Sequence, residues 1–412
     1  MENKSIPDWI VLGGGVSGIA ISEILTRGGK SVLLLEKNSK LASETSKDFH
    51  EWFHSGALYT LVPDNLLTLR YLLGATDDLI EFYSSFSSMN LKPSELGVKI
   101  NKDGWFNDDK IEFRYRSHKL NPIWLSMVSR SISIIDLIKK HDWLRRRAGS
   151  EYGKPKIKTN YRFNKILDQL INNEKFLSIE SPDFTMNSRV LLSDLFSEAI
   201  QNGIEYKVNA KVDSIKEKND YVEVEVDGSF YKSKNILITS PDAISKFVNI
   251  PIQESYAPMA VVENVPDEEK SFVELDYYNK KCINLLKKNN NIGQVGGITL
   301  KKKKDVEDYL KYLILEHKKR NPSIKVIDTY IGIKKELVQK KESRNYLYHI
   351  NQNSSKIWSV VLGKFSLAFS MAPEFYRRIY NENPSKYFQT KHFNDLHSGI
   401  SKTTWQELKD LK

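Results

Sequence analysis

The stretch from Trp9 to Glu36 is the feature that most restricts how this chain can fold. An apolar run, WIVL (9–12), leads into GGGVSG (13–18). A segment with apolar residues at helical spacing follows, and a second apolar run, SVLLLE, closes on Glu36. Strand, glycine turn, helix and strand in this order begin a βαβ unit with a parallel sheet. The sequence therefore predicts an α/β domain at the N-terminus.

Three glycines of this unit, Gly13, Gly15 and Gly18, have the spacing G-x-G-x-x-G. The first allows a tight turn, the second lets the backbone approach a pyrophosphate, and the third lets the helix pack close to the strand. The free N–H groups at the start of the helix favour phosphates. Glu36 is positioned to accept hydrogen bonds from a ribose, which argues against a 2′-phosphate. The motif predicts a bound dinucleotide, either NAD or FAD.

Length and charge limit the remaining possibilities. A chain of 412 residues exceeds the usual size of one hydrophobic core, so we expect two domains or a nucleotide domain with a large insertion. The net charge of +10 comes mostly from lysines spread along the chain, and no nucleic-acid motif accompanies it. We therefore predict a small-molecule substrate and no nucleic-acid partner.

The sequence also predicts the compartment and the absence of a metal site. Cys282 is the one cysteine, which excludes an internal disulfide and a cysteine metal cluster. His50 and His54 lie four residues apart, but no acidic third ligand with suitable spacing follows them. The N-terminus lacks the pattern of a secretory signal, and no run of eighteen apolar residues is present. We expect a cytoplasmic protein without a transmembrane segment, and peripheral membrane contact stays open.

The segment that follows the first unit distinguishes between the two cofactors. Residues 37–60 are rich in Ser and Thr and then in aromatic residues. Short hydroxyl side chains at this point suit contacts with phosphates and with a cofactor that extends further than NAD. An ordinary polar loop is the alternative interpretation.

These residues carry a resemblance to a known family. The N-terminal unit followed by FHSGALYT resembles the D-amino-acid-oxidase-like superfamily of FAD-dependent oxidoreductases. It is most similar to the branch of L-2-hydroxyglutarate oxidases and FAD-dependent glycerol-3-phosphate dehydrogenases. That branch has an Ile-His-(Ser/Gly)-Gly-x-x-Tyr stretch, which here reads Phe53, His54, Ser55 and Gly56, with Tyr59 following. The resemblance implies FAD as the cofactor.

Two later segments extend the resemblance. Residues 189–240 predict a helix, a strand, a hairpin that turns at Asp227-Gly228, and a further strand. In the family this block returns to the nucleotide domain and brings the strand near Val212 beside the adenine. Near the C-terminus, LGKFSLAFSMA (362–372) matches a Gly-Lys-(x)-(Thr/Ser) helix start that the family aims at the flavin. A helix N-terminus stabilises the negative charge of a reduced flavin.

The sequence departs from the family at three points. The family often carries a Gly-x-Arg whose arginine clamps a substrate carboxylate, and Lys334 occupies that place. A lysine is a point charge rather than a bidentate fork. The strand at 236–240 ends in TSPD rather than in small residues and glycine, and Glu51 stands where related sequences tend to have glycine. The backbone near the cofactor is expected to differ there.

The resemblance and the motifs together name the candidate site. His54 is the candidate proton acceptor, with packing beside the flavin as the alternative. His54, Tyr59 and Lys334 are the candidate substrate residues. The candidate cofactor residues are Gly13, Gly15, Val16, Ser17, Gly18, Glu36, Lys37, Ser43, Thr45, Ser46, Val212, Gly363, Lys364, Phe365 and Ser366.

Three basic stretches are weaker candidates. Arg114 and Arg116 lie two residues apart in a strand-like run, so both could point into an anionic pocket. The runs at 143–149 and 300–305 are interpreted as solvated ends of elements, and the first also suits docking to an acidic carrier or to anionic lipid.

We therefore predict an α/β chain, α+β overall, with a Rossmann-like FAD-binding domain and a second, mainly antiparallel-sheet substrate domain. The first comprises residues 1–88, 183–247 and 340–412, and the second comprises 89–182 and 248–339. The expected function is oxidation of a C–OH bond in a small, anionic substrate by hydride transfer to flavin N5. Oxygen or a quinone would accept the electrons. The alternatives are an amine or amino-acid oxidase of the same superfamily, an NAD-linked dehydrogenase, and a nucleotide-binding protein without turnover.

Overall fold

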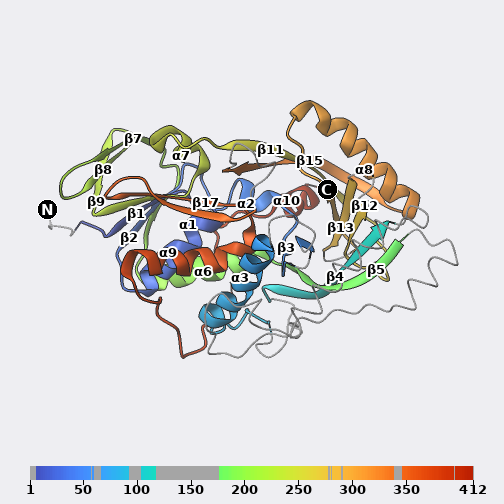
Figure 1. Cartoon of the computed structure of the whole chain (residues 1–412), viewed down its shortest axis with the longest axis horizontal. Coiled ribbons are helices and arrows are strands. Elements are labelled where there is room, and N and C mark those ends of the chain that lie inside the picture. The colour runs from blue at the N-terminus through green and yellow to red at the C-terminus, as the bar shows by residue number, and fades with distance from the viewer. Residues whose placement is uncertain are drawn as a thin grey trace.

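The computed structural model describes most of the chain (Figure 1). The described residues are 6–56, 58–59, 66–91, 104–116, 176–276, 279, 281–288, 291–337, 346–393 and 395–411. Two large sheets lie side by side along the long axis of the molecule, with helices against each (Figure 1).

The first sheet has six strands and is almost entirely parallel. Its strands in spatial order are β16 (Tyr348–Gln352), β17 (Ile357–Leu362), β10 (Asn235–Ile238), β1 (Trp9–Leu12), β2 (Val32–Leu35) and β6 (Glu205–Lys207). Only β16 runs antiparallel to its neighbour among the described pairs. The predicted βαβ start of a parallel sheet is confirmed, with α1 (Val16–Arg27) between β1 and β2.

Both faces of this sheet are buried, which explains why its strands are apolar throughout rather than alternating. Trp9 and Val11 of β1 face a helical layer, whereas Ile10 and Leu12 face a small antiparallel sheet. The helical layer contains α1, α3 (Leu67–Tyr83), α6 (Ser188–Gln201) and α9 (Ala368–Tyr380). The opposite layer contains β7 (Val212–Glu217), β8 (Val222–Val226), β9 (Ser229–Ser233) and α7 (Pro241–Val248).

The hairpin that the sequence predicts at Asp227-Gly228 joins β8 to β9. Both turn residues have positive φ, +49° and +74°, as a two-residue hairpin with right-handed twist requires.

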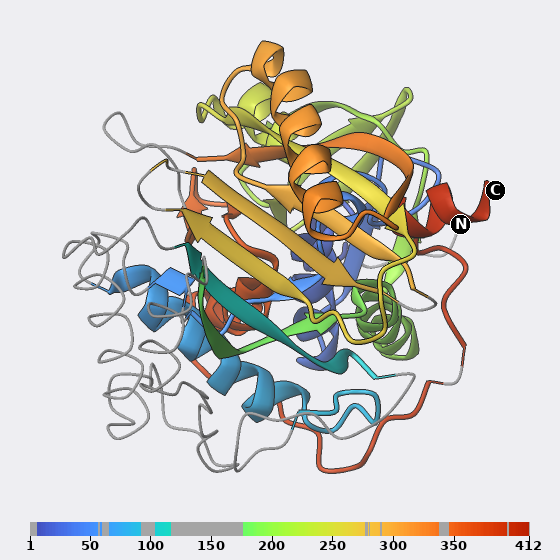
Figure 2. The same ribbon diagram turned by 90° about the vertical axis from the view of Figure 1, so that its right-hand side faces the viewer.

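The second sheet has eight strands and is mainly antiparallel. Its spatial order is β15 (Lys325–Glu336), β11 (Gln253–Glu263), β14 (Gly293–Gly297), β13 (Lys281–Lys287), β12 (Phe272–Asp276), β4 (Phe106–Arg116), β5 (Phe176–Met186) and β3 (Trp52–Phe53). Among the described pairs only β12 and β4 run parallel. Helix α8 (Val306–Arg320) covers its outer face (Figure 2). The predicted fold class is thus confirmed, while the exact domain boundaries stay a prediction.

The C-terminal residues return to the middle of the molecule, where α10 (Thr404–Asp410) lies near α2 (Thr45–Asp48) between the two sheets (Figure 1). Trp405 packs with Val261 and Ile292 of the eight-stranded sheet. One short helical turn, Phe365–Leu367, precedes α9, so the helix predicted after the Gly-Lys pair is present.

Candidate active site

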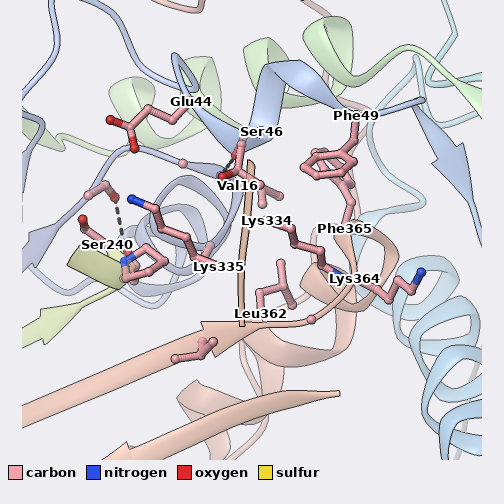
Figure 3. Close-up of a pocket in the computed structure, with 18 of the residues that line it drawn as sticks. Val16, Glu44, Ser46, Phe49, Ser240, Lys334, Lys335, Leu362, Lys364 and Phe365 are labelled. Carbon is pink, nitrogen blue, oxygen red and sulfur yellow. Dashed lines mark hydrogen bonds between the residues drawn. The ribbon is translucent and has the colours of Figure 1, made fainter. Parts of the chain in front are cut away.

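A cavity of about 830 Å³ lies where the two sheets meet. Its walls come from the glycine turn, the Ser-rich segment after β2, the segment before α9, and strands β11 to β15. Every residue that the sequence predicts for the site lines this cavity except Gly18 and Ser366. Segments distant in sequence therefore converge on one space, as Figure 3 shows for Val16, Ser46, Ser240, Leu362 and Phe365.

The glycine turn leaves no room for side chains at two of its positions. Gly13 has φ of +112°, and a Cβ there would lie 2.9 Å from both Ser240 N and Thr239 Oγ1. A Cβ on Gly18 would lie 1.8 Å from the carbonyl oxygen of Gly13. Gly18 thus acts by allowing α1 to approach β1, which is the role of the third glycine in the motif. The turn presents its backbone to the cavity, as a pyrophosphate-binding turn must.

Glu36 holds this turn in place by hydrogen bonds and also lines the cavity. One carboxylate oxygen accepts a hydrogen bond from the Gly14 N–H at 2.7 Å, and the other accepts from the backbone and side chain of Asn38, both at 2.8 Å. A carboxylate has about four acceptor positions, so these bonds leave capacity for a ribose hydroxyl. The residue therefore fits a dinucleotide while fixing the loop.

The Ser-rich segment caps α1 from the side. Ser46 Oγ accepts the N–H of Val16, the first residue of α1, at 3.0 Å (Figure 3). Ser43 bonds to Ser401, and Thr45 donates to the carbonyl of Ile333 on β15. The hydroxyl groups predicted from the sequence thus connect the Ser-rich segment by hydrogen bonds to α1, to the eight-stranded sheet and to the C-terminal segment.

His54 follows β3 and is buried in the cavity wall, with 8% of its surface exposed. Its backbone N–H donates to Ser366 Oγ at 2.9 Å, and its ring packs on Trp52 with centroids 4.2 Å apart. Burial, followed by the positive charge of Lys364, lowers the pKa of His54 to about 4, although Asp183 acts in the opposite direction. The imidazole is neutral at neutral pH and can accept a proton.

Sequence reasoning missed Asp183, which lies on β5 and is fully buried. Its Oδ2 lies 3.7 Å from His54 Nδ1 and accepts a hydrogen bond from Trp52 Nε1 at 2.8 Å. Its Oδ1 accepts from the backbone and the hydroxyl of Ser55. No local motif marks this aspartate, because only the pairing of β3 with β5 brings it to His54.

The lysines of the cavity have different surroundings. Lys334 pairs with Glu336, two residues along the same strand, and Lys364 lies 5.1 Å from the ring centroids of both Tyr59 and Tyr346. Lys334 and Lys335 are neighbours on β15 and point in opposite directions (Figure 3). Lys335 ion-pairs with Asp242, whereas Lys334 contributes a positive potential at His54.

Glu51 explains one departure from the family pattern. It has φ of +56°, the left-handed region that glycine adopts most easily. Burial alone would raise the pKa of Glu51, but an ion pair with Lys288 at 2.8 Å and hydrogen bonds from Ser188 and Trp405 lower it. A non-glycine residue is accommodated here because its carboxylate joins three separate elements.

The hypothesis that Arg114 faces an anionic pocket is wrong. Arg114 pairs with Glu112 and Glu269, lies 4.0 Å from the ring centroid of Phe272, and is not among the residues that line the cavity. The side chain of Arg116 and the basic run at 143–149 lie outside the described residues, whereas the lysines of 301–304 are exposed. Within the described part of the chain, no group of three His, Cys, Asp or Glu is arranged to hold a metal ion.

Comparison with known proteins decides the family. The model of the DAO family, described as FAD dependent oxidoreductase, matches residues 8–278, which is more than half of the chain. The chain belongs to this family. It is therefore an FAD-dependent oxidoreductase, and the resemblance to this superfamily is confirmed. The glycine turn, Glu36 and the cavity of about 830 Å³ fit FAD, which supplies the electron acceptor for substrate oxidation when bound.

Solved structures share the fold of this FAD-dependent oxidoreductase at low sequence identity. L-alpha-glycerophosphate oxidase from Mycoplasma pneumoniae, solved with FAD bound, aligns over 98% of this chain and 100% of its own, with 16% identity and a TM-score of 0.65. Glycine oxidase from Geobacillus kaustophilus aligns over 94% and 99%, with 13% identity and a TM-score of 0.63. L-amino acid deaminase from Proteus vulgaris aligns over 92% and 91%, with 15% identity and a TM-score of 0.62.

One curated protein has a higher identity over a short stretch. UDP-galactopyranose mutase from Mycoplasma pneumoniae is 30% identical over 100 residues, which is 23% of this chain and 22% of that protein. The chain thus matches about a fifth of that protein's length. Among the described helices of this flavoprotein, none has the length and apolarity needed to cross a membrane.

Proposed function

We propose that this enzyme oxidises a carbon that bears a hydroxyl group in a small, anionic substrate. The observation that carries the proposal is His54, a buried and neutral imidazole in the cavity that also contains the glycine turn. The glycine turn and the segment before α9 would hold FAD, whose ring would supply the hydride acceptor for this reaction. Removal of hydride from an alcohol leaves the hydroxyl proton to be taken up, and a positioned imidazole can take it.

The surroundings of His54 support this role. Asp183 Oδ2 lies 3.7 Å from Nδ1, so the ring can direct Nε2 to the substrate while the carboxylate stabilises the imidazolium that forms. The amide of His54 is fixed by Ser366 and its ring by Trp52. A proton acceptor held in this way loses little entropy on reaction.

Positive charge in the cavity supports an anionic substrate. Lys334 and Lys364 both act electrostatically on His54, although they come from different elements. We assign to them the phosphate or carboxylate of the substrate, with Tyr59 beside it. A lysine binds a phosphate well as a point charge, which agrees with the absence of an arginine at position 334.

For the cofactor we retain the assignment made from sequence. The glycine turn and Ser46 would hold the pyrophosphate, Glu36 would bond the ribose, and Val212 would lie beside the adenine. Gly363, Lys364 and Phe365 would lie beside the flavin, and Ser366 would act through His54. The two-domain division given above belongs to the same proposal.

The test begins with the purified protein as isolated. Its visible spectrum is recorded before and after anaerobic addition of hydroxy acids, polyol phosphates and amino acids. Bleaching of the flavin absorbance by hydroxyl-bearing anions supports the proposal. Bleaching of this absorbance by amino acids alone contradicts it. Oxygen uptake during turnover identifies oxygen as electron acceptor, and dye reduction without uptake indicates a quinone-type acceptor.

Oxidation of an amine is the second candidate, because glycine oxidase and an amino acid deaminase share this fold. A free amine has no hydroxyl proton to lose, so it needs no imidazole base. His54→Ala therefore separates the candidates: loss of flavin reduction with retained flavin favours alcohol oxidation, and unchanged reduction by an amino acid favours amine oxidation.

A further inference from the structure

We propose that His50 and Asn284 form a subsite for a second hydroxyl group of the substrate, distinct from the group that is oxidised. The proposal deepens the proposed function, and it rests on it for the premise that a small substrate enters this cavity. It assigns the enzyme to substrates that carry a hydroxyl next to the reacting carbon.

The two side chains come from different elements and meet at one point. His50 follows α2, and Asn284 lies on β13 directly opposite Gly296 of β14. A Cβ on Gly296 would lie 2.1 Å from His50 Nε2 and 3.3 Å from Asn284 Oδ1. Both polar atoms are therefore close to the same point above the sheet, and the absence of a side chain at Gly296 makes room for the imidazole.

Both residues line the cavity, and each has a buried polar atom that no hydrogen bond within the described part of the chain satisfies. Asn284 is 3% exposed, and its Oδ1 and His50 Nε2 are buried atoms without a hydrogen-bond partner among the described residues. A buried polar atom that lacks a partner destabilises the protein, because it has lost its bonds to water and gained none in return. A ligand group that satisfies both atoms would recover this cost on binding.

The chemistry of the pair selects the ligand group. An amide oxygen only accepts hydrogen bonds, so the ligand must donate to Asn284, which a phosphate or carboxylate oxygen cannot do. Burial and then the charge of Lys288 lower the pKa of His50 to about 3, with smaller contributions from His54 and Lys364. The same positive charges disfavour a protonated amine. A neutral hydroxyl fits, because it can donate to Asn284 Oδ1 and accept from the Nε2–H of His50.

This assignment also orients the substrate. The hydroxyl lies against β13 and β14, while the anionic group lies toward Lys334 and Lys364. Leu275 and Cys282 line the same sheet face, so the rest of the wall offers little competing polarity.

The test uses substrate pairs that differ by one hydroxyl and span the open substrate classes. The pairs are glycerol 3-phosphate with 2-hydroxypropyl phosphate, glycerate with lactate, and serine with alanine. For each compound the dissociation constant is measured on the holoenzyme from the anaerobic perturbation or reduction of the flavin spectrum. We expect the member with the extra hydroxyl to bind about tenfold tighter in at least the class that the enzyme accepts, as one hydrogen-bonded group contributes about this much.

Two variants assign the difference to the subsite. Asn284→Leu and His50→Leu should each reduce the tenfold preference to about onefold, while the affinity for the member that lacks the hydroxyl and the bound flavin stay unchanged. The control is Lys281→Ala, on the same strand but exposed and directed over the ring of Tyr312, and it should keep the preference.

Two results would overturn the subsite. One is a wild-type enzyme that binds both members of every pair equally. The other is an Asn284→Leu protein, with normal flavin content, that retains the full preference. If serine is preferred to alanine and no hydroxy acid is oxidised, the proposed function fails while the subsite stands.

Discussion

His54 has an acid–base behaviour that differs from that of an exposed histidine. Its pKa is lowered to about 4, so the ring becomes charged only well below pH 7, because burial and Lys364 disfavour the imidazolium. Trp52 and Asp183 surround the ring on the sheet side, so solvent contributes little to its protonation.

This pKa predicts the pH dependence of the reaction. The rate of anaerobic flavin reduction at low substrate should stay flat from pH 8 to about pH 5 and fall tenfold per unit below about pH 4, since only the neutral imidazole accepts a proton. Stopped-flow absorbance over this range checks it. An acid limb centred near pH 6.5 would contradict the buried environment of His54.

Asp183 is expected to act as a positioning residue for His54. Asp183→Asn should lower the rate of flavin reduction about tenfold to a hundredfold, because the imidazolium loses a neighbouring carboxylate. Since Asp183 raises the pKa of His54, the acid limb should also move to lower pH. A merely structural role would leave the position of that limb unchanged, and flavin content measured on the same samples controls for folding.

At the level of elements, Glu51 connects segments from four parts of the chain. It pairs with Lys288 directly after β13, accepts bonds from Ser188 at the start of α6, and accepts a bond from Trp405 of α10. The side chains of Glu51 and Lys288 are 4% and 3% exposed, so neither charge can be hydrated if the other is removed.

Lys288→Met should therefore destabilise the fold by about 3 kcal/mol, since it leaves a buried carboxylate without its cation. Adding Glu51→Gly should recover part of this loss, because glycine removes the charge and adopts positive φ without strain. Denaturant unfolding of the single and double variants measures both effects. A double variant that is less stable than Lys288→Met would contradict the explanation.

The contact between α1 and the glycine turn gives a second prediction at this level. Gly18→Ala places a Cβ 1.8 Å from the Gly13 carbonyl, and no side chain can move to relieve it. We expect loss of bound flavin and a destabilisation of more than about 2 kcal/mol. Gly29→Ala is the control, because it has positive φ but nothing within 4 Å, and it should cost only about 1 kcal/mol with flavin retained. Flavin release on denaturation and thermal melts report on both.

At the scale of the molecule, three buried histidines should make acid destabilise the protein, although a buried carboxyl such as Asp194, whose pKa burial raises to about 6, acts in the opposite direction. His50, His54 and His317 are buried and neutral, with pKa values lowered to about 3, 4 and 3 by burial first. In this window the unfolded state binds more protons, so stability falls as pH drops from about 6.5 toward 4, by about 1.4 kcal/mol per unit for each group. Urea midpoints at pH 7, 6 and 5 test this, and a midpoint that rises toward pH 5 would contradict it.

Local sequence patterns predicted much of this molecule. Features that depend on pairing between distant segments could not be predicted from the sequence. The βαβ start, the Asp227-Gly228 hairpin and the helix after Lys364 carry signals within a few residues, and the structure contains all three. Asp183 and Asn284 carry no such signal, because strand pairing alone brings them to the cavity. Arg114 was misassigned for the same reason: its partner Glu269 is far away in sequence.

The position of α10 has a consequence for how the protein is made. Lys47 bonds to Glu407, Asp48 accepts from Thr404, and Glu51 accepts from Trp405, so the wall beside the cavity is held by residues that are translated about 350 residues after it. A nascent chain that has not yet reached α10 can form the glycine turn, but it lacks these hydrogen bonds. Stable uptake of the flavin should therefore wait until α10 has left the ribosome and packed beside α2.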